Sequence, residues 1–215
     1  MKFFKYLIFI GLIILISCNN QLKTEYWENG KKKSEIRYKD NKIDGKATWY
    51  YENGNILMQC YYKDNLLDGK LTRWFDNGVK KSEQYYKNDK LNGKSIEWNR
   101  NGIKISEENY INDTLDGEYL LWHVNGKMKV KGAFKKGKFE GKWLYANLQG
   151  KKIGEGNYKN GCGKQYVWYL SGKKRREINY KDNLKDGEEI YYSSKGKIIK
   201  KIIYEKGEVV KTIIP

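Results

Sequence analysis

The sequence is poor in the residues that build most catalytic and metal sites. It contains one histidine and three cysteines in 215 residues. A metal site needs several such ligands close together, and acid–base or nucleophilic catalysis needs a converging set of groups. His123 has no second histidine to converge with. We therefore expect no enzyme, no metal and no cofactor.

Long apolar runs are also missing after the first segment. The run LIFIGLIILI ends at Ile16, follows Lys2 and Lys5, and precedes Ser17. It is shorter than the roughly 20 residues that a transmembrane helix needs. Basic residues, a short apolar stretch and a small residue are typical of a secretory signal peptide. Residues 1–17 are therefore predicted to be cleaved.

The residues LISC, Leu15 to Cys18, resemble the bacterial lipoprotein box. The resemblance implies that acyl chains such as palmitate are attached at Cys18 and hold the protein on a membrane. Residues 18–24 then form the lipidated start and a polar tether. The expected location is the cell envelope, with anchoring to the outer membrane on its periplasmic or surface side. An ordinary secreted protein with an incidental cysteine is the alternative.

Charge of one sign dominates the mature chain. Without residues 1–17, 41 lysines and arginines face 26 acids, a net charge of +15. A secreted chain meets phosphate mainly on lipid head groups and envelope glycans, so an anionic lipid or glycan is a more plausible partner than nucleic acid. The alternative is that the lysines only solvate exposed strands and block edge pairing.

A repeat fills the rest of the chain. Glycine recurs every 24 residues, with one step of 22, at Gly30, Gly54, Gly78, Gly102, Gly126, Gly150, Gly172 and Gly196. Eight residues after each stands an aromatic residue: Tyr38, Tyr62, Tyr86, Tyr110, Phe134, Tyr158, Tyr180 and Tyr204. Four residues before each stand Tyr26, Tyr50, Trp74, Trp98, Trp122, Ala146, Trp168 and Tyr192. A second glycine series comprises Gly45, Gly69, Gly93, Gly117, Gly141, Gly163 and Gly187, with two residues missing before Gly163. Such self-similarity indicates a repeat architecture.

Each unit predicts two β-strands. Asn-Gly between β-prone runs is a strong hairpin signal, because both turn residues then take positive φ. We expect the Asp-Gly turns to join one hairpin to the next. The predicted fold is all-β: an elongated, single-layer antiparallel meander of about eight repeats over residues 25–205, with 206–215 as a C-terminal cap. If the turns have two residues, the Trp and Tyr positions lie on opposite faces unless a bulge intervenes.

Several residues that could carry chemistry have structural interpretations. His123 is expected in a strand, in the repeat position of Trp27, Tyr51, Phe75 and Tyr169. Cys60 is expected to pack in a strand and Cys162 to lie in a turn, about 40 Å away by strand spacing and so unable to pair. Acids before glycine are expected to bond their own following backbone rather than bind calcium or hydrolyse glycans. They are Asp44, Asp68, Asp116, Glu140 and Asp186.

The segments DGKATWYYENGNILMQCYY and DGKLTRWFDNGVKKSEQYY resemble the MORN-type variant repeat, which also occurs in YwqK-family antitoxin-like proteins. The resemblance covers nearly all of residues 25–210. It implies single-layer hairpin ribbons used for protein or lipid contact, and no catalytic residues. The chain departs from the pattern at Ala146 and around Cys162, where we expect a local irregularity.

These observations favour a binding protein. A basic ribbon studded with aromatic residues suits a lipid-anchored interaction scaffold, with a protein as the expected partner. The candidate binding residues are Trp74, Trp98, Trp122 and Trp168. The alternatives are an antitoxin or immunity protein, a structural spacer, and a binder of glycan or anionic lipid surfaces.

Overall fold

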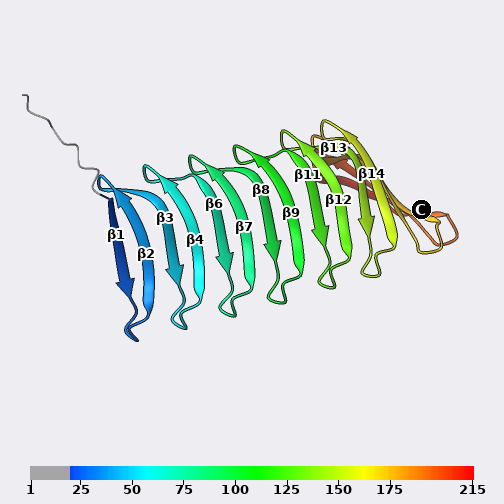
Figure 1. Cartoon of the computed structure of the whole chain (residues 1–215). Coiled ribbons are helices and arrows are strands. Elements are labelled where there is room, and N and C mark those ends of the chain that lie inside the picture. The colour runs from blue at the N-terminus through cyan, green and yellow to red at the C-terminus, as the bar shows by residue number, and fades with distance from the viewer. Residues whose placement is uncertain (1–19) are drawn as a thin grey trace, which may run out of the picture.

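A computed structural model describes residues 20–215 as one antiparallel sheet of 19 strands, with no helix in that range. Each strand pairs with its neighbours in sequence, so the chain forms the meander that the repeat predicts (Figure 1). The predicted signal peptide, residues 1–17, and the predicted lipid site, Cys18, lie outside the described residues.

The repeat unit is a pair of strands, and eight such pairs precede a last strand. The bounds are β1 (Asn20–Tyr26), β2 (Lys32–Lys39), β3 (Lys42–Tyr50), β4 (Ile56–Lys63), β5 (Leu66–Leu67), β6 (Gly69–Trp74), β7 (Lys80–Lys87), β8 (Lys90–Trp98), β9 (Lys104–Ile111), β10 (Thr114–Leu115), β11 (Gly117–Trp122), β12 (Met128–Lys135), β13 (Lys138–Ala146), β14 (Lys152–Lys159), β15 (Cys162–Trp168), β16 (Lys174–Lys181), β17 (Leu184–Tyr192), β18 (Ile198–Glu205) and β19 (Glu208–Ile213). The short strand β5 and its successor β6 both pair with β4, and β10 and β11 both pair with β9. Each short strand therefore shares one position in the sheet with the strand that follows it.

Five-residue loops that contain the first glycine series lie along one edge of the sheet, which we call the loop edge. In the first loop, the Trp27 N–H donates to the Lys31 carbonyl at 2.8 Å. Of Asn29 and Gly30, only Gly30 has a positive φ, at 78°. The prediction that both residues take positive φ is wrong, because Asn29 is held differently: its side-chain oxygen accepts the Lys31 N–H at 3.0 Å.

Two-residue turns lie along the opposite edge, the turn edge. Asp40 and Asn41 there have φ of 50° and 65°. Asp and Asn tolerate this left-handed region better than most residues. The prediction that the Asp-Gly pairs join the hairpins is therefore wrong. Gly45, with φ of 98°, instead forms a bulge within β3 in which residues 44–46 stand opposite Arg37 alone.

The one 22-residue repeat lacks this bulge. Tyr158 of β14 pairs with Gly163 of β15, and Gly156 pairs with Gln165, with no register shift between them. A bulge of three residues against one adds two residues to a strand, so the two missing residues account for its loss. The irregularity predicted around Cys162 is confirmed.

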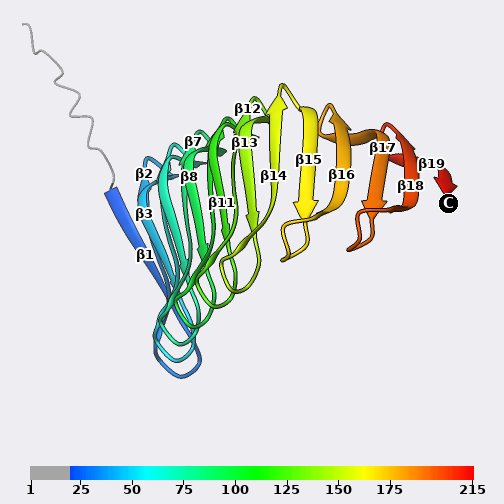
Figure 2. The ribbon, with the colours of Figure 1, turned by 90° about the vertical axis from the view of Figure 1, so that its right-hand side faces the viewer.

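The sheet changes direction at this place. Figure 2 shows β15 to β18 running at an angle to the row formed by the earlier strands. Three strand steps on a flat sheet cover about 14 Å, yet the rings of Phe139 on β13 and Tyr180 on β16 lie 6.1 Å apart. The face that carries these two rings is therefore inside the bend. We call it the inner face and the opposite one the outer face.

The core lies on the inner face in two clusters. Ala47, Cys60 and Leu71 form the first, and Val130, Trp143 and Tyr158 form the second. The Tyr series lies on this face, because Tyr62 pairs with Leu67 and Tyr86 packs beside them against the first cluster. Side chains alternate between the two faces along a strand. Leu71 of the first cluster points to the inner face, so Trp74, three residues later on β6, lies on the outer face, as do the tryptophans at the same repeat position. The sequence left this arrangement open, because its parity count assumed two-residue turns, whereas the loops have five residues and a register shift lies between Arg73 and Trp74.

The segment predicted as a C-terminal cap, residues 206–215, continues the meander as a turn and β19. This strand pairs with β18 along one side and is exposed along its length.

Candidate binding surfaces

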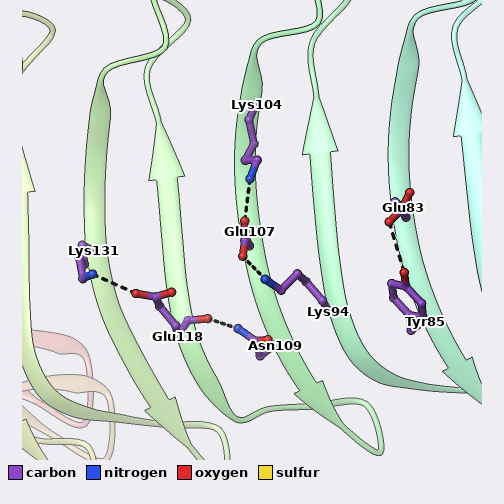
Figure 3. A network of polar contacts seen from close by, with 8 residues as sticks. All are labelled: Glu83, Tyr85, Lys94, Lys104, Glu107, Asn109, Glu118 and Lys131. Carbon is purple, nitrogen blue, oxygen red and sulfur yellow. Dashed lines mark hydrogen bonds and ion pairs between the residues drawn. The ribbon is translucent and has the colours of Figure 1, made fainter.

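The outer face carries a recurring ion-pair ladder. In four repeats a glutamate in the middle of a strand meets two lysines, one three residues earlier on its own strand and one on the preceding strand. Glu107 is the clearest member, with Lys104 at 2.7 Å and Lys94 at 2.5 Å (Figure 3). The others centre on Glu83, Glu155 and Glu177.

These contacts keep the glutamates ionised. The hydrogen bond from Lys104, and after it that from Lys94, lowers the pKa of Glu107 below its ordinary value. The hydrogen bond from Lys174 does the same for the pKa of Glu177. Two cations therefore share each anion, and every ladder leaves about one positive charge uncompensated. The chemistry that this surface offers is attraction of anions.

The four predicted tryptophans lie in one row on the outer face, at the strand ends next to the loop edge. Each is half-buried. A lysine ammonium lies over the ring of Trp98 at 5.0 Å, of Trp122 at 5.1 Å and of Trp168 at 5.2 Å. Such cation–π contacts occupy one ring face. A ligand would stack there only by displacing lysine, so a binding role for Trp74, Trp98, Trp122 and Trp168 stays a prediction.

His123 is the first residue of a loop rather than a strand residue, so that prediction is wrong. It follows β11 directly, and its N–H closes the loop by donating to the Lys127 carbonyl at 2.8 Å. Its Nε2 donates to the Ala146 carbonyl of the next repeat at 3.0 Å, since a carbonyl only accepts. Tyr51 donates in the same way to the Trp74 carbonyl at 2.8 Å. The histidine thus links repeats.

The two described cysteines are both free. Cys60 is completely buried in the first core cluster, which confirms its predicted packing role. Burial raises the pKa of its thiol. Cys162 is exposed and is the first residue of β15, directly after the turn formed by Asn160 and Gly161, so the prediction that it lies in the turn is wrong. The prediction that the two do not pair is confirmed.

Acids of the second glycine series have structural contacts, though not the predicted ones. Asp116 accepts the N–H of Lys136 at 3.0 Å, and Glu140 accepts that of Asn160 at 2.9 Å. These two acids therefore bond the next turn along the ribbon rather than their own following backbone. Within residues 20–215, no group of three or more His, Cys, Asp or Glu side chains could hold a metal ion.

The positive charge is concentrated in the second half of the ribbon. Residues 20–122 contain 18 lysines and arginines against 17 acids, a net charge of +1. Residues 123–215 contain 23 against 9, a net charge of +14. Reasoning from whole-chain composition missed this asymmetry, although a count repeat by repeat would have found it.

The strands, loops and faces together define a β-hairpin repeat protein. The family model for the MORN repeat variant matches residues 22–40, 43–64, 67–88, 162–182 and 185–206. The chain therefore carries MORN-variant repeats, a class of repeat that commonly mediates binding and is generally non-catalytic. The model leaves residues 89–161 unmatched, although their strands continue the same pattern. A search of curated proteins finds no match. No helix of the described part is long and apolar enough to cross a membrane.

Proposed function

We propose that this protein is a lipid-anchored scaffold of the cell envelope that binds a protein partner without catalysis. The observation that carries the proposal is the concentration of charge, +14 on residues 123–215, on a thin sheet with two solvent-facing sides. A cleft enzyme encloses its substrate. A ribbon of this kind offers an extended surface instead.

The hydrogen bonds between successive loops indicate that some residues stabilise the ribbon while others are left for binding. The Asn29 amide donates to the Glu52 carbonyl at 3.0 Å and the Asn53 amide to the Asp76 carbonyl at 2.9 Å, so each loop holds the next. Lysines outnumber their glutamate partners in the ladders. The asparagines of the loops thus stabilise the ribbon, while the surplus cations face solvent and are available to a partner.

The anchor rests on the sequence of the first eighteen residues. In cells fed an alkyne analogue of palmitate, the wild-type protein should take up the label and sediment with membranes. The Cys18→Ser variant should lose both the label and the membrane association. Labelling that persists in Cys18→Ser contradicts the anchor.

The scaffold is tested by cross-linking the full chain in intact cells and identifying the captured molecules by mass spectrometry. A scaffold should retain several envelope proteins, whereas an antitoxin should retain one toxin and a spacer none. Repeating the capture at rising salt separates the alternatives further. Binding to an anionic lipid or glycan surface falls steeply with ionic strength, and an aromatic-centred protein interface loses much less.

A further inference from the structure

The loop edge changes its chemistry along the ribbon. The second residue of each of the first three loops is an acid: Glu28, Glu52 and Asp76. In the fifth, sixth and seventh loops the same position holds Val124, Leu148 and Leu170, which are 72%, 51% and 63% exposed. These three side chains are more than half exposed, so the fold buries only part of their apolar surface. Exposed apolar groups that recur along one edge and are rimmed by polar residues are typical of an interaction site.

Lysines surround these tips. The fifth to seventh loops end in Lys127, Lys151 and Lys173, and the eighth contains Lys195 and Lys197. None of these four loops contains an acid, so together they carry +5, against −1 for the first four. The Lys127 ammonium donates to the Gln149 carbonyl at 2.9 Å. This contact holds the cation along the edge, beside the Leu148 tip.

A hollow of about 250 Å³ opens at the seventh loop. Trp168, Tyr169 and Leu170 give it an apolar wall, and Lys151 and Lys152 give it a cationic one. A group that is apolar at its centre and carries a carboxylate fits both walls. Neighbouring loops are about 10 Å apart by strand spacing, so the three tips span roughly 20 Å.

The position of the proposed anchor favours a protein over the anchoring membrane. Asn20 pairs with Lys39 at the turn edge. The described chain therefore enters the sheet at the turn edge, opposite the loop edge. Strands of eight residues separate the two edges by about 26 Å. If Cys18 is lipidated, the loop edge is the one farther from its membrane.

We propose that the tips Val124, Leu148 and Leu170, with Lys127, Lys151 and Lys173, form a docking edge for a protein whose surface has an apolar centre and an acidic rim. This inference rests on the proposed function and names the partner chemistry. The apolar tips bury into the partner's centre, and the lysines pair with its carboxylates. Loops one to four, which together carry −1, lie outside the contact.

The test uses the full acylated chain in nanodiscs of neutral phosphatidylcholine and a defined probe, the random copolymer poly(Glu,Tyr). Poly-Glu serves as the probe without apolar groups, and phosphatidylglycerol vesicles serve as the lipid probe. Binding is measured by titration calorimetry or biolayer interferometry. The variants are Leu148→Ser with Leu170→Ser, since serine occupies this position in the eighth loop. The matched control is Val79→Ser with Ile103→Ser, two apolar residues in the third and fourth loops.

We expect poly(Glu,Tyr) to bind the wild type at least tenfold more tightly than poly-Glu does. The Leu148→Ser, Leu170→Ser double variant should lose at least that tenfold preference, and the control should stay within twofold of wild type. Circular dichroism checks that both fold. The inference is overturned if poly-Glu binds equally well, if vesicles bind and the copolymer does not, or if the control loses as much. In each of these cases, partners cross-linked to the faces of the sheet would still support the scaffold.

Discussion

The two halves of the ribbon share a repeat but differ in core, charge and shape. Residues 20–122 are nearly neutral, run straight and pack small residues such as Ala47 and Cys60 at their centre. Residues 123–215 are strongly basic, contain the bend and pack large rings such as Trp143 and Tyr158. The repeat therefore fixes strand pairing and leaves the core and the surface free to diverge.

The contacts at the turn edge show how one bond pattern serves both shapes. In the first half, the Leu67 N–H donates to the Asp89 carboxylate at 2.7 Å, one repeat away. At the bend, Gly161 offers no side chain, and Asn183 reaches past it. Its oxygen accepts the Phe139 N–H and its amide donates to the Gly137 carbonyl, both at 2.8 Å. The contact between these two non-adjacent repeats therefore occurs where the bulge is missing and where the turn of the repeat between them carries a glycine.

The largest expected effect concerns Trp143. Its ring covers the backbone of Gly132, where an added Cβ would lie 2.2 Å from it. The side chain is 3% exposed and contacts the rings of Tyr119, Phe134 and Phe139. We expect Trp143→Ala to cost about 3 to 5 kcal/mol of unfolding free energy, the usual loss for a buried tryptophan. Urea denaturation measures it.

Hydrogen exchange on the same variant tests whether the halves are separable. In a repeat protein each unit contacts only its neighbours. Protection should fall in β12 to β16 and persist in β2 to β6. Leu71→Ala, in the first cluster, is the matched control and should reverse the pattern. Equal loss of protection along the whole ribbon in either variant would show that the sheet unfolds as one unit.

A second, smaller effect compares the loss of a buried carboxylate in the second half with the loss of an ion-pair-ladder carboxylate in the first half. Glu189 is fully buried, with Lys185 at 2.7 Å and Arg176 at 3.3 Å. Removing one partner of a buried pair leaves unpaired charge. Because the two cations are about a third exposed, solvent screens part of the loss, and we expect Glu189→Gln to cost about 2 kcal/mol. Glu107→Gln, on the solvated ladder, should cost under about 1 kcal/mol.

The pH dependence has the same sign at both sites. Burial raises the pKa of Glu189, but hydrogen bonds led by that from Lys185 outweigh it and leave the pKa below its ordinary value. The pKa of Glu107 is also lowered, chiefly by Lys104. A depressed pKa stabilises the fold above the unfolded-state pKa, about 4.3 for glutamate, and this stability is lost as pH falls through the folded pKa. The difference in unfolding free energy between wild type and each variant should therefore be smaller at pH 3 than at pH 7, as measured by denaturation at the two pH values.

A third change tests the origin of the bend. Inserting Leu-Asp between Cys162 and Gly163 copies Leu115 and Asp116 of the repeat two copies earlier and should restore the bulge. We expect the ribbon to straighten, with a larger radius of gyration in X-ray scattering. The same dipeptide inserted between Ser193 and Ser194, in a loop, is the control for length. An equal radius in both insertions would show that the aromatic cluster, not the missing bulge, bends the sheet.

Much of this fold could be predicted from the sequence, because glycine and aromatic periods mark each strand pair. The turn geometry could not be predicted in the same way. The residues with positive φ at the turn edge include Asp40, Asn41 and Lys136, and a search keyed to glycine passes over them. Gly45, taken for a turn, forms a bulge instead. Only the pairing register distinguishes these two uses of glycine.

The candidate site was predictable in part. The sequence identified Trp98 and Tyr110 as recurring positions but left open whether they share a face, because a parity count depends on turn lengths and bulges that the sequence did not fix. It could not show that Lys80 lies over the Trp98 ring, because that contact joins two strands. Nor could any local pattern reveal the bond from Asn183 to Gly137, which spans 46 residues and depends on the bend.

The smallest expected effect is a response to salt that has opposite signs in the two halves. Residues 123–215 carry +14, so their charges repel, and salt that screens this repulsion should stabilise them. Residues 20–122 carry +1 and hold balanced pairs such as Arg100 with Asp76 at 2.6 Å, which the same salt weakens. Raising sodium chloride shortens the Debye length from about 30 Å at 0.01 M to about 8 Å at 0.15 M. Hydrogen exchange at the two salt concentrations should show protection rising in β16 to β18 and falling slightly in β6 to β9. A uniform change would mean that local ion pairs, rather than the net charge of each half, set the electrostatic part of the stability.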